Sequence, residues 1–354
     1  MSVTIKEIAL RTGLSIPTVG NVLGRAASRY SPATRKRVMQ AAEELGYKPN
    51  SSARAMRQGR FGCAALVLSR SRQSTHSYIP PNLLDGLDDE LGLHNMHLTV
   101  SRLTDEELTQ TDFIPKVLRE HLADGMIVNY THEIPPNMLQ LIRSHHTPAV
   151  WLNAKLDGDC VYPDDFSAAR RATEELISRG HKRIAFVHLV SPGHWQGDLS
   201  VNRSRLHYSA GDRAEGYACA MRSAGLSPQV LSHERFVHET EQMKVCRALL
   251  SGENRPTAVL AYSEGEGQAA ITAAISLGLI VPRDLSVLAF AAFQYYVGGN
   301  PVSVASVPSA EMGRRAVRML LQKLKQPDVL CKPESVAYGL GEGQETIAPP
   351  VNNG

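Results

Sequence analysis

The side chains best suited to bind a charged ligand are concentrated in the first 60 residues. There, 11 lysines and arginines stand against three acidic residues, Glu7, Glu43 and Glu44, which gives this segment a net charge of +8. The whole chain carries only +3, so the remaining residues sum to −5. A compact basic segment ahead of a mildly acidic body predicts that the segment binds a polyanion and that the body has another task.

Asn21, in this segment, carries a carboxamide, a group that can read a nucleic-acid base. A carboxamide can bond adenine bidentately through N6 and N7, whereas Ile16 and Pro17 can offer only apolar contacts, for instance to thymine methyl groups. Arginines such as Arg54 and Arg57 are better suited to contact phosphates, which fixes the position of a protein on DNA. The basic segment thus contains a carboxamide that could read a base and arginines that could contact phosphates.

Short helices are predicted to position these side chains. Thr4 and Glu7 have the spacing of a capping box, and Gly13 provides the backbone freedom that a tight turn requires. Ser15 can cap a second helix, with Pro17 in its first turn, where no intrahelical amide is lost. Two helices around such a turn are typical of a helix-turn-helix, whose second helix enters the major groove.

A third helix is predicted to begin at Ser31 and Pro32 and to end at Gly46. Its apolar positions would face the first two helices, and its basic side chains would lie on the exposed side. Periodicity alone also fits a plain three-helix bundle with a solvated basic face.

Several segments of this region closely resemble the headpiece of the lactose-repressor (LacI) family: residues 4–9, 13–15, 18–19, 22–23, 31–35 and 41–50. The resemblance implies a DNA-binding transcription regulator that reads bases chiefly at Ile16, Pro17 and Asn21. In the family, a Ser-Arg or Ser-His pair usually stands where this chain has Gly20 and Asn21. The implied DNA contacts are Thr4, Ser15, Ile16, Pro17, Thr18, Asn21, Arg29, Ser31, Asn50, Arg54 and Met56.

Residues 50–57 could form about two helical turns before Gly59, and a helix that short is marginal in water by itself. The segment resembles the hinge helix of the family, which orders when two subunits meet over the operator. Met56 occupies the position of a leucine that wedges into the minor groove, and its adaptable apolar side chain suits that role. The alternative is that Met56 packs against the partner subunit.

The body alternates strand-like apolar runs with helical patterns, which predicts parallel sheets covered on both faces. The runs are 64–68, 125–128, 149–152, 183–187, 258–261 and 286–290, and the helical patterns include 168–179, 213–224 and 267–277. Nearly 300 residues is large for one such sheet, so two α/β subdomains are expected. In such folds, ligands bind outside the carboxyl ends of the strands.

The body also resembles the periplasmic-binding-protein-like effector domain of the same family, whose chain crosses between two parallel-sheet subdomains three times. We expect crossings near residues 161, 291 and 325. The predicted domains are a helix-turn-helix headpiece (1–48), a hinge (49–60) and an effector-binding and dimerisation domain (61–354). Its N-subdomain is expected at about 61–161 and 291–325, and its C-subdomain at about 162–290 and 326–354.

The effector residues of the family carry over only in part. Arg213, in an intact Arg-x-x-Gly motif, matches the arginine that holds polar groups of the ligand; the alternative is a surface salt bridge. A ligand-binding Asp is missing from the segment 289–292, and Asn153 stands where another Asp is usual. The expected effector contacts are Arg213, Glu264, Asn153, Ser69, Tyr78 and Phe290. An ordinary monosaccharide is therefore a less secure expectation than in a typical member, and a more acidic ligand, or none, stays open.

Other chemistry is not indicated by the sequence. The glycine-rich segment 265–270 follows a strand but lies at the wrong end of the fold for a dinucleotide site. Five cysteines without a C-x-x-C motif, and no signal peptide, predict reduced thiols and a cytoplasmic protein. We expect no metal, no cofactor, no membrane span and no enzymatic activity.

The leading hypothesis is a dimeric repressor that binds a palindromic operator under the control of a small-molecule effector, a carbohydrate or related metabolite. A dimer follows from two heads addressing two half-sites. The alternatives are a regulator that works as an activator or global regulator through a protein co-regulator, and a ligand-binding module with an accessory basic head.

Overall fold

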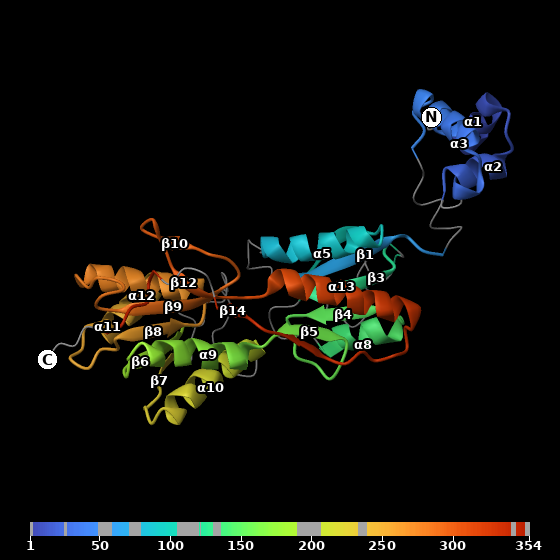
Figure 1. The fold of residues 1–354 in the computed structure, drawn as a ribbon. Coiled ribbons are helices and arrows are strands. Elements are labelled where there is room, and N and C mark those ends of the chain that lie inside the picture. Colours follow the sequence, from blue (N-terminus) through green and yellow to red (C-terminus); the bar gives the residue numbers. More distant parts are fainter. Residues whose placement is uncertain are drawn as a thin grey trace. The chain divides into compact units, whose positions relative to one another are not determined.

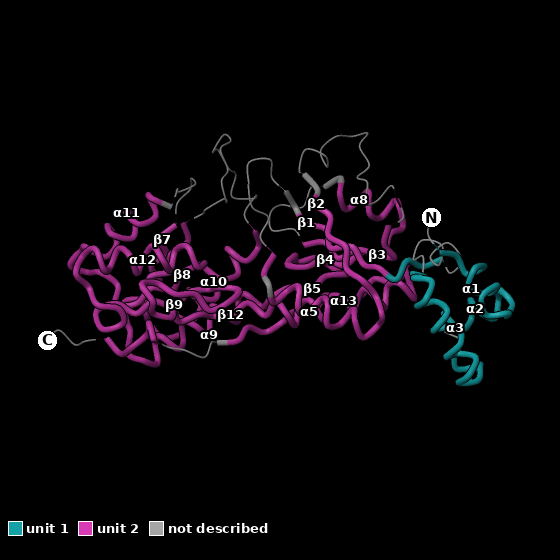
Figure 2. The backbone as a smooth tube through the Cα atoms, turned by 90° about the horizontal axis from the view of Figure 1, so that it is seen from above, with its two compact units in different colours: residues 1–62 teal, residues 63–354 magenta. Residues whose placement is uncertain are grey.

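The computed structural model describes residues 3–24, 27–48, 59–70, 79–104, 120, 122–129, 136–189, 207–232, 239–340 and 345–350. The chain divides into two compact units, Met1–Gly62 and Cys63–Gly354 (Figure 2). Asn50, Arg54, Met56 and Tyr78 lie outside the described residues, and so does the expected hinge helix. The wedge role of Met56 thus stays a prediction.

The first unit is the predicted helical head, with helices α1 (Ile5–Thr12), α2 (Ile16–Val22) and α3 (Pro32–Glu44) and a 3₁₀ turn η1 (Ala27–Arg29). The carboxylate of Glu7 accepts hydrogen bonds from the backbone N–H and the hydroxyl of Thr4, at 2.6 and 2.9 Å. Gly13 ends α1 with φ 62°, the left-handed conformation that favours glycine. One core joins the three helices: Ile8, Ala9, Val19, Val22, Val38, Ala41 and Ala42.

Sheet A, in the first lobe (the N-subdomain) of the second unit, is parallel throughout. Its strand order is β13-β5-β4-β3-β1-β2. Helices α5 (Pro81–Leu93) and α13 (Ser309–Lys325) pack on one face, and α8 (Pro136–Ser144) packs on the other (Figure 1). Both faces are buried, which explains the continuous apolar runs. The strands are β1 (Cys63–Arg70), β2 (His97–Thr104), β3 (Gly125–Asn129), β4 (Ala149–Leu152), β5 (Cys160–Pro163) and β13 (Glu334–Val336).

Sheet B, in the second lobe (the C-subdomain), has the strand order β14-β12-β9-β8-β6-β7. It is parallel except for the edge strand β14. Helices α9 (Asp165–Ser178) and α10 (Tyr208–Ser223) cover one face, and α11 (Glu239–Leu250) and α12 (Glu264–Ser276) cover the other. The strands are β6 (Ile184–His188), β7 (Gln229–Ser232), β8 (Ala258–Ala261), β9 (Ser286–Ala291), β12 (Ser303–Ser306) and β14 (Gly339–Leu340). A hairpin of β10 (Tyr296–Val297) and β11 (Asn300–Pro301) precedes β12.

For two of the three crossings between the subdomains, the structure differs from the position predicted from the sequence. The first lies between β5 and α9, as expected near residue 161, but the second follows β12 and the third lies between β13 and β14. Residues 303–306 therefore belong to the C-subdomain, because β12 pairs in parallel with β9, and residues 326–336 belong to the N-subdomain. The strand β12, with the sequence Ser-Val-Ala-Ser, lacks the continuous apolar run by which the other strands were recognised.

No helix among the described residues is long and apolar enough to cross a membrane. The same residues contain no group of three or more histidine, cysteine or acidic side chains arranged to hold a metal ion.

Candidate functional site

The first turn of α2 presents apolar side chains to solvent. The hydroxyl of Ser15 accepts the backbone N–H of Thr18 at 3.2 Å and so caps the helix. Ile16, directly after the cap, is 50% exposed, and Pro17 is exposed as well. A large apolar side chain left in water at the start of a helix is available for contact with another molecule.

Asn21 lies on the exposed side of α2, one turn after Pro17. Its amide nitrogen donates to the hydroxyl of Tyr30 at 3.0 Å. This bond uses one of the two N–H groups and orients the carboxamide, which the sequence did not reveal. A carboxamide held in this way loses less side-chain entropy on binding than a mobile one.

The remaining head residues proposed as DNA contacts include both caps and exposed charges. Ser31 caps α3 by accepting the backbone N–H of Thr34 at 3.2 Å, and Thr4 is bonded to Glu7 at the start of α1. Arg29 is exposed at the end of η1. The caps thus have a structural role whether or not they also contact DNA.

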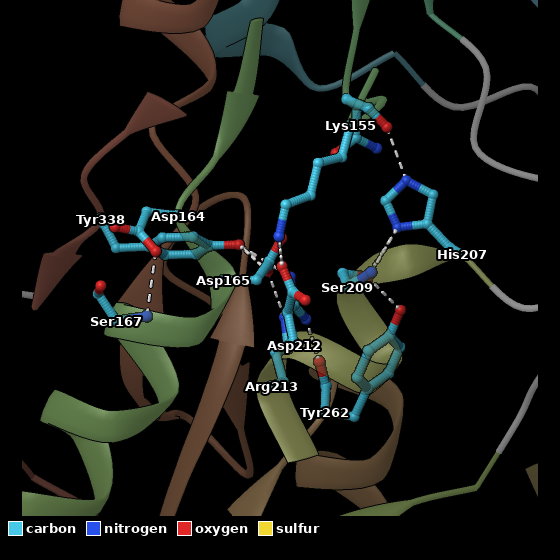
Figure 3. A network of polar contacts seen from close by, with 11 residues as sticks. Lys155, Asp164, Asp165, Ser167, His207, Ser209, Asp212, Arg213, Tyr262 and Tyr338 are labelled. Atoms are coloured by element: carbon cyan, nitrogen blue, oxygen red, sulfur yellow. Dashed lines mark hydrogen bonds and ion pairs between the residues drawn. The ribbon is translucent and has the colours of Figure 1, made fainter. Parts of the chain in front are cut away.

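In the second unit, an ion pair between Arg213 and Asp165 forms the centre of a buried polar network (Figure 3). The Nε of Arg213, on α10, donates to Oδ1 of Asp165 at 2.6 Å, and Asp165, at the start of α9, is fully buried. The other two guanidinium nitrogens donate to the backbone carbonyl of Tyr262, at 2.5 Å, and to the hydroxyl of Tyr338, at 2.9 Å. Every nitrogen of the guanidinium therefore already has a partner within the chain.

Tyr338 lies in the third crossing and joins the ion pair to it. Its hydroxyl donates to Oδ1 of Asp165 at 2.6 Å, and burial raises the pKa of Tyr338, which keeps the hydroxyl protonated. The guanidinium also lies 4.3 Å from the ring centroid of Phe290 and 4.7 Å from that of Tyr262. Aromatic rings and hydrogen bonds thus hold Arg213 between the first and third crossing segments.

A second group of contacts joins the start of α10 to the loop after β4, in the other subdomain. The Nε2 of His207 donates to the backbone carbonyl of Asn153 at 2.7 Å, and the ammonium of Lys155 donates to Asp212 at 2.9 Å. On its other side, His207 bonds to the hydroxyl of Ser209 at 2.7 Å, and Ser209 bonds to the hydroxyl of Tyr262 at 2.8 Å. The chain of contacts therefore reaches from one subdomain to the arginine network of the other.

Two family models match this sequence. The model described as bacterial regulatory proteins, lacI family, matches residues 4–50, and that of the periplasmic binding protein-like domain matches residues 173–343. The chain belongs to the LacI family. It is therefore a DNA-binding transcriptional regulator, and the LacI family consists of such regulators rather than of enzymes.

Similar LacI-family proteins match along nearly the whole chain. The probable HTH-type transcriptional regulator EndR of Paenibacillus polymyxa is 26% identical over 339 residues, which are 93% of this chain and 92% of EndR. The HTH-type transcriptional repressor CytR of Escherichia coli K12 is 26% identical over 336 residues, 91% of this chain and 90% of CytR.

Solved structures show the same fold. The lac repressor dimer bound to operator and the anti-inducer ONPF matches with a TM-score of 0.73 at 19% identity, covering 98% of this chain and 100% of that one. A complex of the transcriptional regulator CelR with cellobiose matches with a TM-score of 0.63 at 23% identity, covering 97% and 99%.

The structure of this LacI-family chain places the expected effector residues in different surroundings. Arg213 and Phe290 are buried against each other, so the arginine is not part of a surface salt bridge. Glu264 is half-buried at the first position of α12, where burial raises its pKa. Asn153 has φ 56° and meets α10 through its carbonyl. Ser69 ends up near the carboxyl end of β1, and its side chain is not among those described.

Sequence reasoning missed several residues that surround Arg213: Asp165, His188, His207, Ser209, Tyr262, Glu266 and Tyr338. Asp164 and Asp165 lie at a crossing, directly after a strand. In the sequence, an acidic pair in this position indicates only that a helix begins there. Asp164 does cap α9, by accepting the backbone N–H of Ser167 at 3.1 Å, whereas Asp165 points into the network. The local sequence pattern could therefore indicate the capping role of Asp164, but not the role of Asp165 in the buried network.

His188, at the carboxyl end of β6, is expected to make the stability of the protein depend on pH. Burial, and secondarily the charge of Arg213, lowers the pKa of His188 to about 4. The unfolded chain would take up this proton near pH 6.5, so the free energy of unfolding should be highest above that pH and should fall as the pH drops toward 4. We expect a loss of about 2.5 kcal/mol from this residue between pH 7.5 and pH 4.5, measured by urea denaturation.

The His188→Phe variant is the control, because it keeps a ring against Tyr262, whose centroid lies 4.2 Å from that of His188. Its stability should change less with pH than that of the wild type. Equal pH dependence in the two proteins would contradict the role of His188.

Proposed function

We propose that this chain is a dimeric repressor that binds a palindromic operator and whose operator affinity is changed by a small molecule bound at the junction of the two subdomains. The observation that carries the proposal is the exposed Asn21 carboxamide, which is oriented by Tyr30 and lies on the same helix as the exposed Ile16, on a basic head with its own core. The family resemblance supports the rest, since similar chains include the repressors CytR and PurR.

The charges of the junction favour a neutral effector, such as a sugar or sugar derivative, over an anionic one. Asp165 already compensates Arg213, and an acidic ligand that took over the arginine would leave a fully buried carboxylate unpaired. The nearby Glu266, 2% exposed, adds a further carboxyl group. An anion therefore faces an uncompensated cost that a polyol does not. The CelR structure contains the neutral sugar cellobiose by its own description, which supports this class.

Selection of bound sites from random double-stranded DNA tests the function, followed by footprinting of the selected sequence. We expect a protected palindrome and a dimer by sedimentation. Absence of any preferred sequence would contradict the operator reading. Calorimetry with matched pairs of neutral sugars and their sugar acids tests the effector class, and tight binding of the acids alone would contradict it.

Replacement of Asn21 by alanine is expected to weaken binding to the selected operator about 5-fold to 150-fold, because one bidentate base contact is worth about 1–3 kcal/mol. Binding to random DNA should change little, and discrimination at one base pair of each half-site should relax. Tyr30→Phe serves as the matched control, since it removes only the hydroxyl that orients Asn21. Equal losses on operator and random DNA would mean that Asn21 positions the head without reading a base.

A further inference from the structure

Direct contacts between the two subdomains converge on one short stretch, the start of α10. Lys155 and the carbonyl of Asn153 come from the loop after β4. On the other side, His207 is the N-cap of α10 and Asp212 is its fifth residue. The ring of Tyr162, on β5, meets that of Tyr208 edge-on, with centroids 6.1 Å apart. Lys155, Asp212 and His207 are drawn together in Figure 3.

The same stretch is connected to the buried arginine network. His207 leads through Ser209 to the hydroxyl of Tyr262, and the backbone carbonyl of Tyr262 accepts from Arg213. Arg213 follows Asp212 directly on α10, so a movement of the helix start displaces both groups of contacts. A movement of α10 therefore changes both the contacts across the junction and the contacts at the crossings.

An ion pair that spans two subdomains can change the equilibrium between their arrangements, whereas a pair within one helix cannot. The pair between Lys155 and Asp212 is partly exposed, with side-chain exposures of 48% and 27%, and such pairs contribute about 0.2–1 kcal/mol to stability. When its two partners belong to bodies that move apart, however, the whole of that energy favours one arrangement over the other. A modest contact then changes the ratio of the two arrangements severalfold.

We propose that the Lys155–Asp212 ion pair and the His207–Asn153 hydrogen bond form a latch that holds the two subdomains closed without any effector. This inference rests on the proposed function. The latch sets the resting ratio of closed to open molecules, and hence the operator affinity of the effector-free protein. A bound effector shifts this ratio from the value that the latch fixes.

The separation of the subdomains is the first readout. Spin labels attached through non-natural residues at Asp88, in α5, and Glu253, after α11, report the distance between the lobes in the full-length protein. Lys155→Ala and Asp212→Ala should each widen the distribution, and the double variant should widen it no further than either single one. The control is Glu241→Ala, which removes an exposed ion pair within α11, from Lys244 at 2.6 Å, and should leave the distribution unchanged.

Operator affinity without effector is the second readout. Lys155→Ala and Asp212→Ala should change the Kd in the same direction, by about twofold to fivefold, with Glu241→Ala at the wild-type value. His207→Phe, which removes the bond to the Asn153 carbonyl, should change it in that direction too. Distances and Kd values equal to those of the control, or single effects that simply add in the double variant, would overturn the latch.

The two readouts separate this inference from the proposed function. If no variant, nor the wild type, binds a preferred operator while the distances still widen, the proposed function fails and the latch stands. If every variant binds the operator equally and the distances are unchanged, the function stands and the latch fails.

Discussion

Replacing Gly216 with alanine is expected to lower the free energy of unfolding of the α/β unit by about 3 kcal/mol. A Cβ at this position of α10 would lie 2.2 Å from the carbonyl oxygen of Phe166 and 3.1 Å from both the backbone N of Arg170 and the Cβ of Ala169. These atoms belong mainly to the backbone of α9, so α10 would have to move away from it. Urea denaturation followed by circular dichroism measures the loss.

Gly211→Ala is the matched control on the same helix. A Cβ at Gly211 meets no atom within 4 Å, and alanine is favoured over glycine inside a helix by about 1 kcal/mol. This variant should therefore be as stable as the wild type or slightly more so. Equal destabilisation of both variants would contradict the close approach of α9 and α10. Because Gly216 follows Arg213 by one turn, its variant should also disturb the buried network.

Asp165→Asn is expected to destabilise the protein by about 3–5 kcal/mol, the usual effect of removing one partner of a buried ion pair. The change keeps the size of the side chain but leaves the charge of Arg213 uncompensated, with the arginine 8% exposed. It also weakens the bond from Tyr338, since a neutral amide oxygen is a poorer acceptor than a carboxylate. Urea denaturation at pH 7.5 is the measurement.

Two further variants distinguish charge from packing at this position. Glu215→Gln removes a pair with Arg222 on the same helix whose side chains are 59% and 58% exposed, and it should change stability by less than about 0.5 kcal/mol. The double variant Asp165→Leu with Arg213→Met removes both charges and should recover much of the loss. A double variant as unstable as Asp165→Asn would show that shape, rather than charge, governs the site.

The elements of this fold could be predicted where the sequence pattern is local and repeated. Continuous apolar runs such as 149–152 and 258–261 became strands because sheets covered on both faces bury every side chain. The caps at Ser15 and Ser31 are local as well, and they define the ends of helices in the head. Strand β12 was assigned to the wrong subdomain because its membership depends on pairing with β9, which no local pattern records.

The candidate site could be predicted only in part for the same reason. Arg213 was found from its motif, but its partners Asp165 and Tyr338 lie 48 and 125 residues away in the sequence. Whether an arginine faces a ligand or an internal carboxylate depends on which segments the fold brings together. In the head, by contrast, Asn21 and its partner Tyr30 are nine residues apart, and all of the expected contacts that are described lie within one short unit.

The path of the chain through the lobes also affects the order in which the protein can fold during synthesis. The head has its own core within residues 8–42 and is complete once that segment leaves the ribosome. Sheet A begins at Cys63 but needs α13 to cover one face and β13 to finish its edge, and sheet B takes its last strand from residues 339–340. Neither lobe is complete until more than 330 residues have been made. A nascent chain therefore displays a folded DNA-binding head long before it has the lobes that would regulate it.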